Sequence, residues 1–235
     1  LMMTLMKKNK LVKPFVKWAG GKRQLIPQIE QYLPLNFATY YEPFLGGGAM
    51  LFHLQPAHCV VNDVNTEIIN VYRAVKNDVE QLIRLLKEYK NESDYYYKIR
   101  GLDRIPAYQK MTDTERAARV IYLNKTCFNG LFRVNQQGQF NVPFGKYKKP
   151  NIVNSETLLA VSEFLQQSDC QLLSADFARA VGSADRDDFV YFDPPYDPIS
   201  SSSSFTGYTL NGFDRAQQER LKESCDELSQ KGAKF

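Results

Sequence analysis

The tetrapeptide Asp193-Pro194-Pro195-Tyr196 places an acid, two prolines and an aromatic ring directly after the hydrophobic run 189–192. Two adjacent prolines fix two φ angles and remove two N–H donors, so the segment is stiff and presents its carbonyl groups outward. A carboxylate and a nearby carbonyl can both accept hydrogen bonds from an –NH2 group, and Tyr196 can stack on a flat ring. The residues therefore predict a site for an amino group on a planar heterocycle. The alternative is a strand-terminating turn with an exposed aspartate.

A second candidate site is the glycine-rich stretch 42–48 (EPFLGGG), which follows another apolar run. Glycines after a strand let the backbone pack closely against a cofactor. The spacing is not G-x-G-x-x-G, so the dinucleotide fingerprint is absent. Asp63 ends the next apolar run, where an acidic residue commonly meets ribose hydroxyls. The glycines and Asp63 together indicate an adenosine-containing cofactor that has no pyrophosphate.

The stretch 15–22 (FVKWAGGK) places the single tryptophan of the chain, Trp18, beside a Gly-Gly pair and between Lys17 and Lys22. A simple N-terminal turn is one interpretation. A degenerate phosphate loop is another, but the pattern G-x-x-x-x-G-K-[ST] is missing because Arg23 follows Lys22.

These residues need a scaffold that brings strand ends together. Near-continuous apolar runs that end on glycine or aspartate are typical of buried parallel strands, and we predict strands at 39–44, 59–64, 170–174 and 189–192. Helical patterns lie between them, at 25–32, 66–75 with Asn65 as N-cap, 79–89, 155–165 and 214–228. The alternation predicts an α/β protein with a doubly wound, mainly parallel, Rossmann-like sheet. Asp193 would then lie at the carboxyl end of a strand, where ligands bind.

The middle of the chain breaks this alternation. It is helical and then forms a hairpin, in which 132–134 and 139–142 flank the turn 135–138. We therefore expect a catalytic and cofactor-binding domain made of 1–65 and 154–235, and an inserted domain at 66–153. The end of the chain, 232–235, looks like the opening of another sheet strand, so the catalytic domain would lack its C-terminal strands.

Basic residues gather in this inserted region. The window 116–155 contains no acidic residue, and its basic residues are Arg116, Arg119, Lys125, Arg133, Lys146, Lys148 and Lys149. Aromatic residues are interleaved with them. Basic groups can neutralise phosphates, and hairpin side chains can reach base edges. The pattern favours a nucleic-acid surface over an ordinary solvated basic face.

Composition limits the other possibilities. The 235 residues are 43% hydrophobic and 24% charged, with a formal net charge of +4, as in a globular protein. The cysteines and histidines show no metal-ligand spacing, and we predict no metal and reduced thiols. The N-terminus has the wrong order of apolar and basic parts for a secretory signal, and no apolar run could span a bilayer. We expect a cytoplasmic protein, without a membrane partner, that acts as a monomer.

The motifs and their order resemble the Dam-type DNA adenine-N6 methyltransferases, in which the cofactor motif precedes the target-recognition domain and the catalytic motif comes last. The matching stretches are K-W-A-G-G-K at 17–22, E-P-F-x-G-G-G at 42–48, N-D-x-N at 62–65, N-G-L-x-R-x-N…F-N-V-P-x-G-x-Y at 129–147, D-P-P-Y at 193–196 and F-T-x-Y at 205–208. The resemblance covers almost the whole chain.

The resemblance implies a site-specific enzyme that moves a methyl group from S-adenosylmethionine to adenine N6 in duplex DNA, within GATC. Cofactor contacts are expected at Trp18, Lys22, Glu42, Phe44, Gly46, Gly48, Asp63 and Asp193. The target adenine would flip out of the helix and be held by Asp193, Pro194 and Tyr196. DNA contacts are expected at Lys17, Phe128, Asn129, Leu131, Arg133, Pro143, Lys146 and Tyr147.

Arg133 is the candidate for base readout, because arginine can bond guanine O6 and N7 together. Phe128 could fill the space left by the flipped adenine, or it could belong to the core. A cognate restriction endonuclease is an expected partner. The alternatives are an enzyme acting on cytosine N4 or RNA adenine, and a catalytically impaired or truncated DNA-binding form.

Overall fold

The computed structural model describes residues 8–18, 22–195 and 213–235. In this part of the chain, the strands β1 (Tyr40–Glu42), β2 (His58–Asn62), β3 (Asp169–Leu173) and β4 (Phe189–Val190) form a parallel sheet in the order β3-β2-β1-β4. The predicted α/β fold with a mainly parallel sheet is confirmed. Each predicted strand is present, with ends that differ from the prediction by at most two residues.

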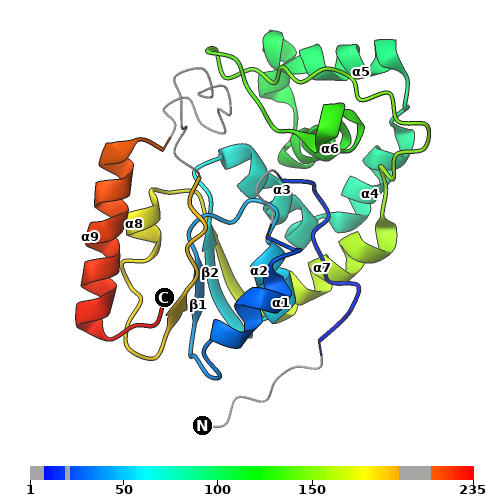
Figure 1. Cartoon of the computed structure of the whole chain (residues 1–235). Helices are drawn as coiled ribbons and strands as arrows, with labels where there is room; N and C mark the ends of the chain where they lie inside the picture. The colour runs from blue at the N-terminus through cyan, green and yellow to red at the C-terminus, as the bar shows by residue number, and fades with distance from the viewer. Residues whose placement is uncertain (1–7, 19–21, 196–212) are drawn as a thin grey trace.

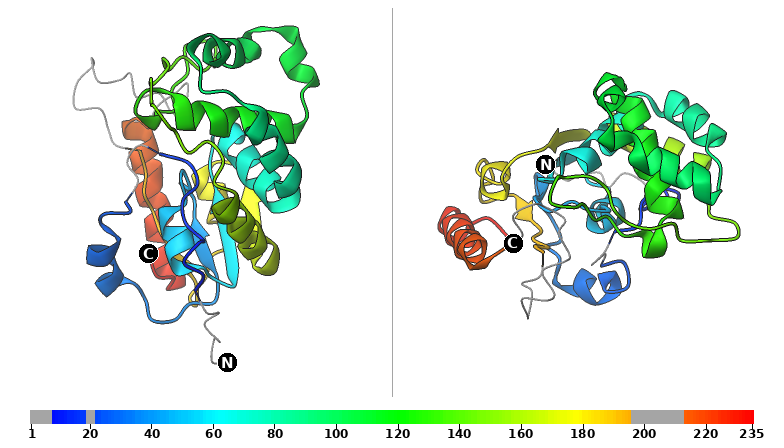
Figure 2. Two further views of the ribbon diagram at one scale, coloured as in Figure 1. Left: turned by 90° about the vertical axis from the view of Figure 1, so that its right-hand side faces the viewer. Right: turned by 90° about the horizontal axis from the view of Figure 1, so that it is seen from above.

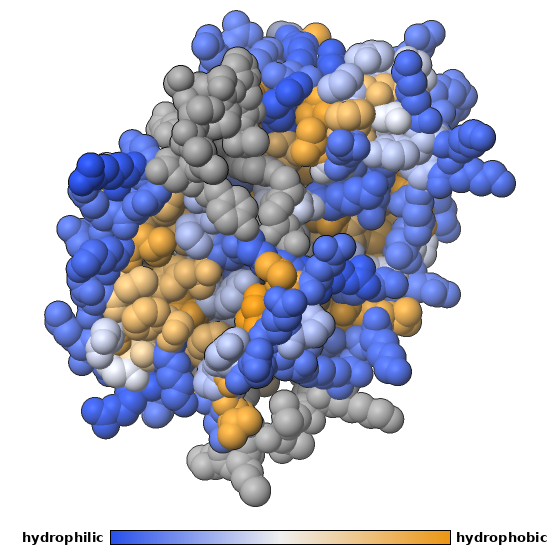
Figure 3. Space-filling model, in the orientation of Figure 1, coloured by the Kyte–Doolittle hydropathy of each residue, from blue (hydrophilic) through white to orange (hydrophobic). Residues whose placement is uncertain are grey.

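Both faces of the sheet are covered (Figures 1 and 2). Alternate side chains of the strands point to opposite faces. Tyr40, Val61 and Phe189 join the larger core, which also takes side chains from α2 (Ala49–Leu54), α3 (Thr66–Asn77) and α7 (Ser155–Gln167). Tyr41 and Val190 join a smaller core beneath α8 (Phe177–Ala180) and α9 (Arg215–Lys231). The outer surface of α9 is hydrophilic in Figure 3, which agrees with an amphipathic covering helix.

Local sequence explains where the helices begin. The side chain of Asn65 accepts hydrogen bonds from the amides of Glu67 and Ile68, so the predicted N-cap of α3 is confirmed. Asp214 is the N-cap of α9 and not its first residue. The short helices α2 and α8 were not predicted. The predicted helix 25–32 is α1 (Ile26–Ile29) followed by the 3-10 turn η1 (Glu30–Tyr32).

The middle region contains α4 (Val79–Glu88), α5 (Ser93–Arg100), the 3-10 turns η2 (Gly101–Arg104) and η3 (Pro106–Lys110), α6 (Asp113–Thr126) and η4 (Phe128–Gly130). Thr112 and Glu115 form a capping box at the start of α6. Tyr96 and Tyr122 from these helices belong to the same hydrophobic core as the sheet residue Tyr40. The middle region, residues 66–153, therefore packs directly on the part of the chain that carries the sheet.

The predicted hairpin is present between residues 131 and 142. Within this fully described segment, Val134 and Phe140 form one antiparallel bridge. The Asn141 amide donates to the Arg133 carbonyl at 3.0 Å, and Gly138 takes the positive φ of 75° that the turn needs. The hairpin is a pair of extended segments joined at few points, and not a full two-stranded ladder.

Residues 232–235 continue the sheet beyond β4, as the sequence predicts. Lys234 forms a parallel bridge with Phe189, and its carbonyl accepts from the Val190 amide at 2.8 Å. Among the described helices, none has the length and apolar character required to cross a membrane.

Candidate active site and nucleic-acid interface

The carboxyl ends of β1, β2 and β4 converge at one edge of the sheet. In the sheet, β1 lies between β2 on one side and β4 on the other, and the chain runs from β1 to β2 before it later reaches β4. Such a reversal opens a crevice at the carboxyl ends of the strands. The glycine-rich loop leaves β1 there, Asp63 leaves β2, and Asp193 follows β4. The fold thus brings together three motifs that are far apart in the sequence.

The loop after β1 is built around glycines that no other residue could replace without strain. Gly46 and Gly48 have φ values of 47° and 68°, in the left-handed region that other residues rarely adopt. A Cβ atom on Gly46 would lie 2.5 Å from Trp18 Cδ1, and one on Gly48 would lie 2.6 Å from the hydroxyl of Tyr72. The absence of side chains lets the loop lie against Trp18 and Tyr72.

Asp63 holds this loop in place. Its Oδ2 accepts from the Gly46 amide at 2.9 Å, and its Oδ1 accepts from the Asn65 amide at 2.9 Å. Burial raises the pKa of Asp63, while these two amides act in the opposite direction. Each carboxylate oxygen keeps further acceptor capacity, so Asp63 can still bind hydroxyl groups of a ligand.

Asn62 is a supporting residue to which the sequence analysis assigned no role. Its amide nitrogen donates to the carbonyls of Pro43 and Ala175, both at 3.0 Å, and its amide oxygen accepts from the Ala175 amide at 2.8 Å. One buried side chain therefore connects the loops that follow β1, β2 and β3.

Glu42 lies beneath the loop and is buried. Its Oε2 accepts from the Tyr40 hydroxyl at 2.7 Å and from the Leu51 amide at 3.0 Å. Burial raises the pKa of Glu42 to about 8; the two hydrogen bonds lower it in part, and the nearby acids Asp193 and Asp63 raise it further. At neutral pH the carboxyl group is therefore mainly protonated and supports the loop from below.

Lys22 and Asp193 form an ion pair across the site. Lys22 Nζ lies 2.7 Å from Asp193 Oδ1, and the two side chains are 16% and 25% exposed. The pair joins the N-terminal motif to the segment after β4. Pro194 is half-buried beside it. Tyr196 lies outside the described residues, as do the F-T-x-Y motif at 205–208 and the serine run 200–204.

Phe44 belongs to an aromatic cluster on the other side of the loop. Its ring centroid lies 5.3 Å from that of Phe177, 5.7 Å from that of Phe213 and 6.5 Å from that of Phe192. The cluster connects the loop after β1 with α8 and with the segments before α9 and after β4. A flat ligand ring could pack against such a wall.

Trp18 connects the cofactor loop to the hairpin. Its indole packs against Gly46 and Gly47, and it stacks on the ring of Phe132 with centroids 5.4 Å apart. The sequence motifs predicted no role for Phe132. The alternation of the hairpin strand, which sets Phe132 opposite to Arg133, could have indicated that Phe132 faces inward.

Lys17 contacts the middle region, residues 66–153, through its backbone and its side chain. Its amide donates to Asn124 Oδ1 at 2.7 Å, and its carbonyl accepts from Asn124 Nδ2 at 2.6 Å. The Lys17 side chain runs along Gly130, and its Nζ lies 4.8 Å from the ring centroid of Tyr147. Two of the expected DNA contacts, Lys17 and Tyr147, are thus neighbours.

The other expected DNA contacts lie along the hairpin and in the segments directly before and after it. Phe128 is 50% exposed, so it does not belong to the core. Asn129 follows it with a φ of 54°, and Lys146 has a φ of 55°. Leu131 is half-buried, and Pro143, whose carbonyl accepts from the Phe128 amide at 2.8 Å, is exposed.

Arg133 is held within the hairpin. Its Nε donates to Asn141 Oδ1 at 2.8 Å, and one terminal nitrogen donates to the Asn141 carbonyl at 3.4 Å. The guanidinium is therefore oriented by the opposite strand before any ligand binds. An oriented guanidinium loses less conformational freedom when it forms two parallel hydrogen bonds.

Two of the seven basic residues in the window 116–155 do not contribute to a basic surface, contrary to the prediction. Arg116 pairs with Glu67, and buried Arg119 pairs with Asp103 at 2.8 Å. Both acids lie outside the window, so counting charges within it missed them. These two arginines are structural, and the basic surface rests on the remaining five residues. One of them, Lys125, has its pKa lowered to about 8 by burial and by the charge of Lys17.

Comparison with known proteins agrees with this arrangement. A family model described as D12 class N6 adenine-specific DNA methyltransferase matches residues 18–235. The Type II methyltransferase M1.LlaDCHI of Lactococcus lactis subsp. cremoris is 47% identical over 233 residues, which cover 98% of this chain and 82% of that protein. The Type II methyltransferase M.MjaIII of Methanocaldococcus jannaschii is 42% identical over 242 residues, covering 95% and 83%. A DNA adenine methylase of Serratia marcescens is 35% identical over 232 residues, covering 95% and 80%.

Proposed function

Because this chain belongs to the D12 class N6 adenine-specific DNA methyltransferase family, we propose that S-adenosylmethionine is its methyl donor and that GATC in duplex DNA is its target. The observation that carries this proposal is the contact of Lys22 with Asp193 beside the loop that Asp63 anchors. It joins the expected catalytic residue to the expected cofactor site at one edge of the sheet.

The residues at this edge fit S-adenosylmethionine. The carboxylate of Asp63 suits ribose hydroxyls, since it keeps acceptor capacity after binding two backbone amides. The indole of Trp18 offers an aromatic face, which attracts cations, and Asp193 offers a negative charge to a sulfonium. Lys22 suits the carboxylate of the methionine part. Gly46 and Gly48 let the loop that Glu42 supports pack against Trp18 and Tyr72, so that it would form the floor of the cofactor site, and Phe44 would close the other side.

The chain's residues would orient the adenine and supply no covalent intermediate. S-adenosylmethionine supplies the electrophilic methyl group when it is bound. Asp193 and the Pro194 carbonyl would accept hydrogen bonds from the adenine amino group and aim its nitrogen lone pair at the methyl carbon, and Tyr196 would stack on the base. The amino nitrogen loses its proton after transfer. Because this amino group is buried in duplex DNA, the base must first flip out, at a cost of a few kcal/mol.

Sequence choice would depend on the hairpin. Arg133 is oriented by Asn141, and an arginine on a hairpin can bond guanine O6 and N7 in the major groove. The resemblance of the hairpin motif to that of Dam-type enzymes supports guanine in GATC as its target. Lys146 and Lys17 would contact phosphates, while Phe128, Asn129, Leu131, Pro143 and Tyr147 would line the DNA path.

The two parts of the chain would have different roles. Residues 1–65 and 154–235 would bind the cofactor and perform catalysis, and 66–153 would recognise the target. Two of the relatives are named Type II methyltransferases, which supports a partner endonuclease of the same specificity.

The test is methyl transfer from labelled S-adenosylmethionine to duplexes that contain GATC, a scrambled sequence or no adenine. We expect label on adenine in GATC alone. The Asp193→Ala variant should lose turnover and keep most of its DNA affinity. Asp226→Asn, which removes an exposed ion pair with Lys222 on α9, serves as the control.

Other results have distinct meanings. Label on cytosine would contradict adenine as the target base, and label on all adenines would contradict GATC. If no duplex is labelled although the folded protein binds S-adenosylmethionine, this chain is a DNA-binding form with impaired catalysis. Absence of cofactor binding would contradict the assignment of the site itself.

A further inference from the structure

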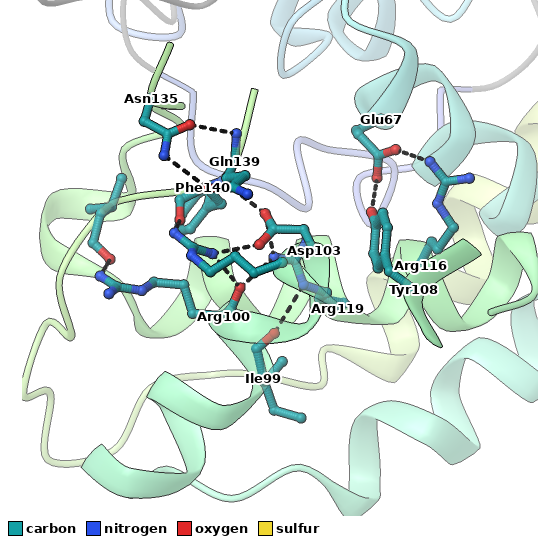
Figure 4. A network of polar contacts seen from close by, with 12 residues as sticks. Glu67, Ile99, Arg100, Asp103, Tyr108, Arg116, Arg119, Asn135, Gln139 and Phe140 are labelled. Atoms are coloured by element: carbon teal, nitrogen blue, oxygen red, sulfur yellow. Dashed lines mark hydrogen bonds and ion pairs between the residues drawn. The ribbon is translucent and has the colours of Figure 1, made fainter. Parts of the chain in front are cut away.

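We propose that Asp103 and Arg104 are specificity-determining positioning residues, which fix the recognition hairpin by holding both backbone groups of Phe140. This inference rests on the proposed role of the hairpin in reading DNA bases. Neither residue belongs to the hairpin, and neither is among the expected DNA contacts. Both lie on the turn η2, which follows α5. Figure 4 shows Asp103 next to Phe140 of the hairpin.

The hairpin needs an external support. In residues 131–142, Val134 and Phe140 form one antiparallel bridge, and isolated two-stranded hairpins are marginally stable in water. A pocket lies behind it, lined by Phe132, Val134 and Phe140 on the hairpin side and by Leu123 of α6 on the other. Packing behind the hairpin therefore leaves a pocket, although Phe140 itself is buried, and polar contacts add to the packing that fixes its position.

Asp103 and Arg104 supply those contacts at one residue. The Phe140 amide donates to Asp103 Oδ2 at 2.8 Å, and Arg104 Nη2 donates to the Phe140 carbonyl at 2.7 Å. Asp103 and Arg104 are also paired with each other. Two side chains thus take the place of a neighbouring strand, because they hold both the N–H and the C=O group of Phe140.

The support is anchored in the core of the recognition region. Asp103 Oδ2 lies 2.8 Å from Arg119 Nη2, and the two side chains are 10% and 4% exposed. Arg119, on α6, also donates to the carbonyls of Ile99 at 3.0 Å and Arg100 at 2.8 Å. The Arg119 guanidinium, which binds Asp103 and both of these carbonyls, cannot move without breaking several hydrogen bonds. The position of Phe140 is therefore tied to α5 and α6.

Phe140 in turn sets the position of Arg133. Its neighbour Asn141 donates its amide to the Arg133 carbonyl and accepts from Arg133 Nε. A displacement of Phe140 would move Asn141 and turn the guanidinium away from its orientation. Bidentate readout of guanine needs both hydrogen bonds in place, and recognition groups must stay within about 0.5 Å of their productive position.

The contacts of Asp103 and Arg104 do not include Lys22, Asp63 or Asp193. Loss of these contacts should therefore change discrimination between DNA sequences more than it changes cofactor binding. The effect of a substitution would appear in the ratio of kcat/KM for the preferred duplex to kcat/KM for duplexes with one base pair replaced.

The test compares Asp103→Asn and Arg104→Gln with the wild-type protein and with the Asp226→Asn control. Methylated adenines are first mapped on plasmid DNA, so that every variant is compared on the sequence the wild-type protein prefers. We expect the discrimination ratio to fall roughly tenfold or more in both variants, with cofactor affinity within about twofold of wild type. Amide hydrogen exchange across residues 139–142 should become faster in both variants, and the control should match wild type.

Arg104→Gln keeps the test decisive if Asp103→Asn does not fold, because the Arg104 side chain is 31% exposed and its loss leaves the Asp103–Arg119 pair intact. An unchanged discrimination ratio in a folded variant would overturn the proposal, and so would unchanged hydrogen exchange in the hairpin. The wild-type map alone decides whether GATC is the target. The comparison of variants with wild type decides the role of Asp103 and Arg104.

Discussion

Glu42 makes a quantitative prediction about the site, because its buried carboxyl group has a pKa of about 8 in the folded protein and an ordinary value of 4.5. The folded state therefore binds a proton more tightly than the unfolded state does. The contribution of the Glu42 carboxyl group to the free energy of unfolding is fully present below about pH 4.5 and is lost as the pH rises toward 8. A difference of about 3.5 pKa units corresponds to a ceiling of about 5 kcal/mol.

The substitution Glu42→Gln isolates this effect. A glutamine oxygen can still accept from the Tyr40 hydroxyl and the Leu51 amide, which both bind one oxygen of Glu42. The variant should match wild type near pH 5. It should become more stable than wild type as the pH rises. The difference between the two free energies of unfolding should change by about 4 kcal/mol between pH 5 and pH 9. Asp63, whose pKa is also raised by burial, is present in both proteins and cancels in the comparison.

The assay is urea unfolding of both proteins at several pH values in this range, from which the free energy of unfolding is obtained at each pH. Glu219→Gln is the control, since that carboxylate is 65% exposed on α9 and should give no pH-dependent difference. A constant difference between Glu42→Gln and wild type across the range would refute the reasoning, because Glu42 would then be ionised throughout. Cofactor affinity at neutral pH should stay within a few fold of wild type, because Glu42 is already mainly protonated there.

Other perturbations test the loop and the hairpin. Gly46→Ala should weaken cofactor binding, measured by calorimetry, at least about tenfold, because the new Cβ would lie 2.5 Å from Trp18 and the left-handed backbone conformation costs an alanine about 1–2 kcal/mol. Gly138→Ala is the control: it has a φ of 75° but open space around its Cβ, and it should keep the cofactor affinity of the wild-type protein. Arg133→Ala should lower kcat/KM on GATC about 5- to 150-fold and have little effect on duplexes that lack the guanine; equal losses on both would contradict readout. Lys146→Gln should reduce the slope of log affinity against log salt by about one, and an unchanged slope would exclude a phosphate contact.

The sequence was sufficient for those parts of the fold that depend on local patterns. Apolar runs that end in polar or glycine residues correctly predicted the strands, and Asn65 correctly predicted the start of α3. The helix α2 was missed because its six residues, flanked by Gly48 and Gln55, are too few to show a helical period. The strand β4 ends at Val190, although the next amide, that of Tyr191, still donates to the Tyr41 carbonyl at 2.8 Å.

Tertiary pairing was beyond the sequence. Arg116 and Arg119 contribute to a basic window in the sequence, yet their charges are neutralised by Glu67 and Asp103 from other elements. A count within a window cannot find a partner that only folding brings near. The same reason explains why Asp103, an acid among ordinary surface residues in the sequence, gave no sign of its place behind the hairpin.

The N-terminal motif shows how the two regions depend on each other. Asn124 of α6 fixes both backbone groups of Lys17, so the next residue, Trp18, is set by the recognition region. Trp18 then lies between Phe132 of the hairpin and Gly46 of the cofactor loop. Because closely packed contacts transmit displacements, a shift of Phe132 must be absorbed by the indole or passed on to Gly46. Because the Asp103 and Arg104 variants are expected to keep a cofactor affinity near that of the wild-type protein, we expect the indole of Trp18 to absorb such a shift.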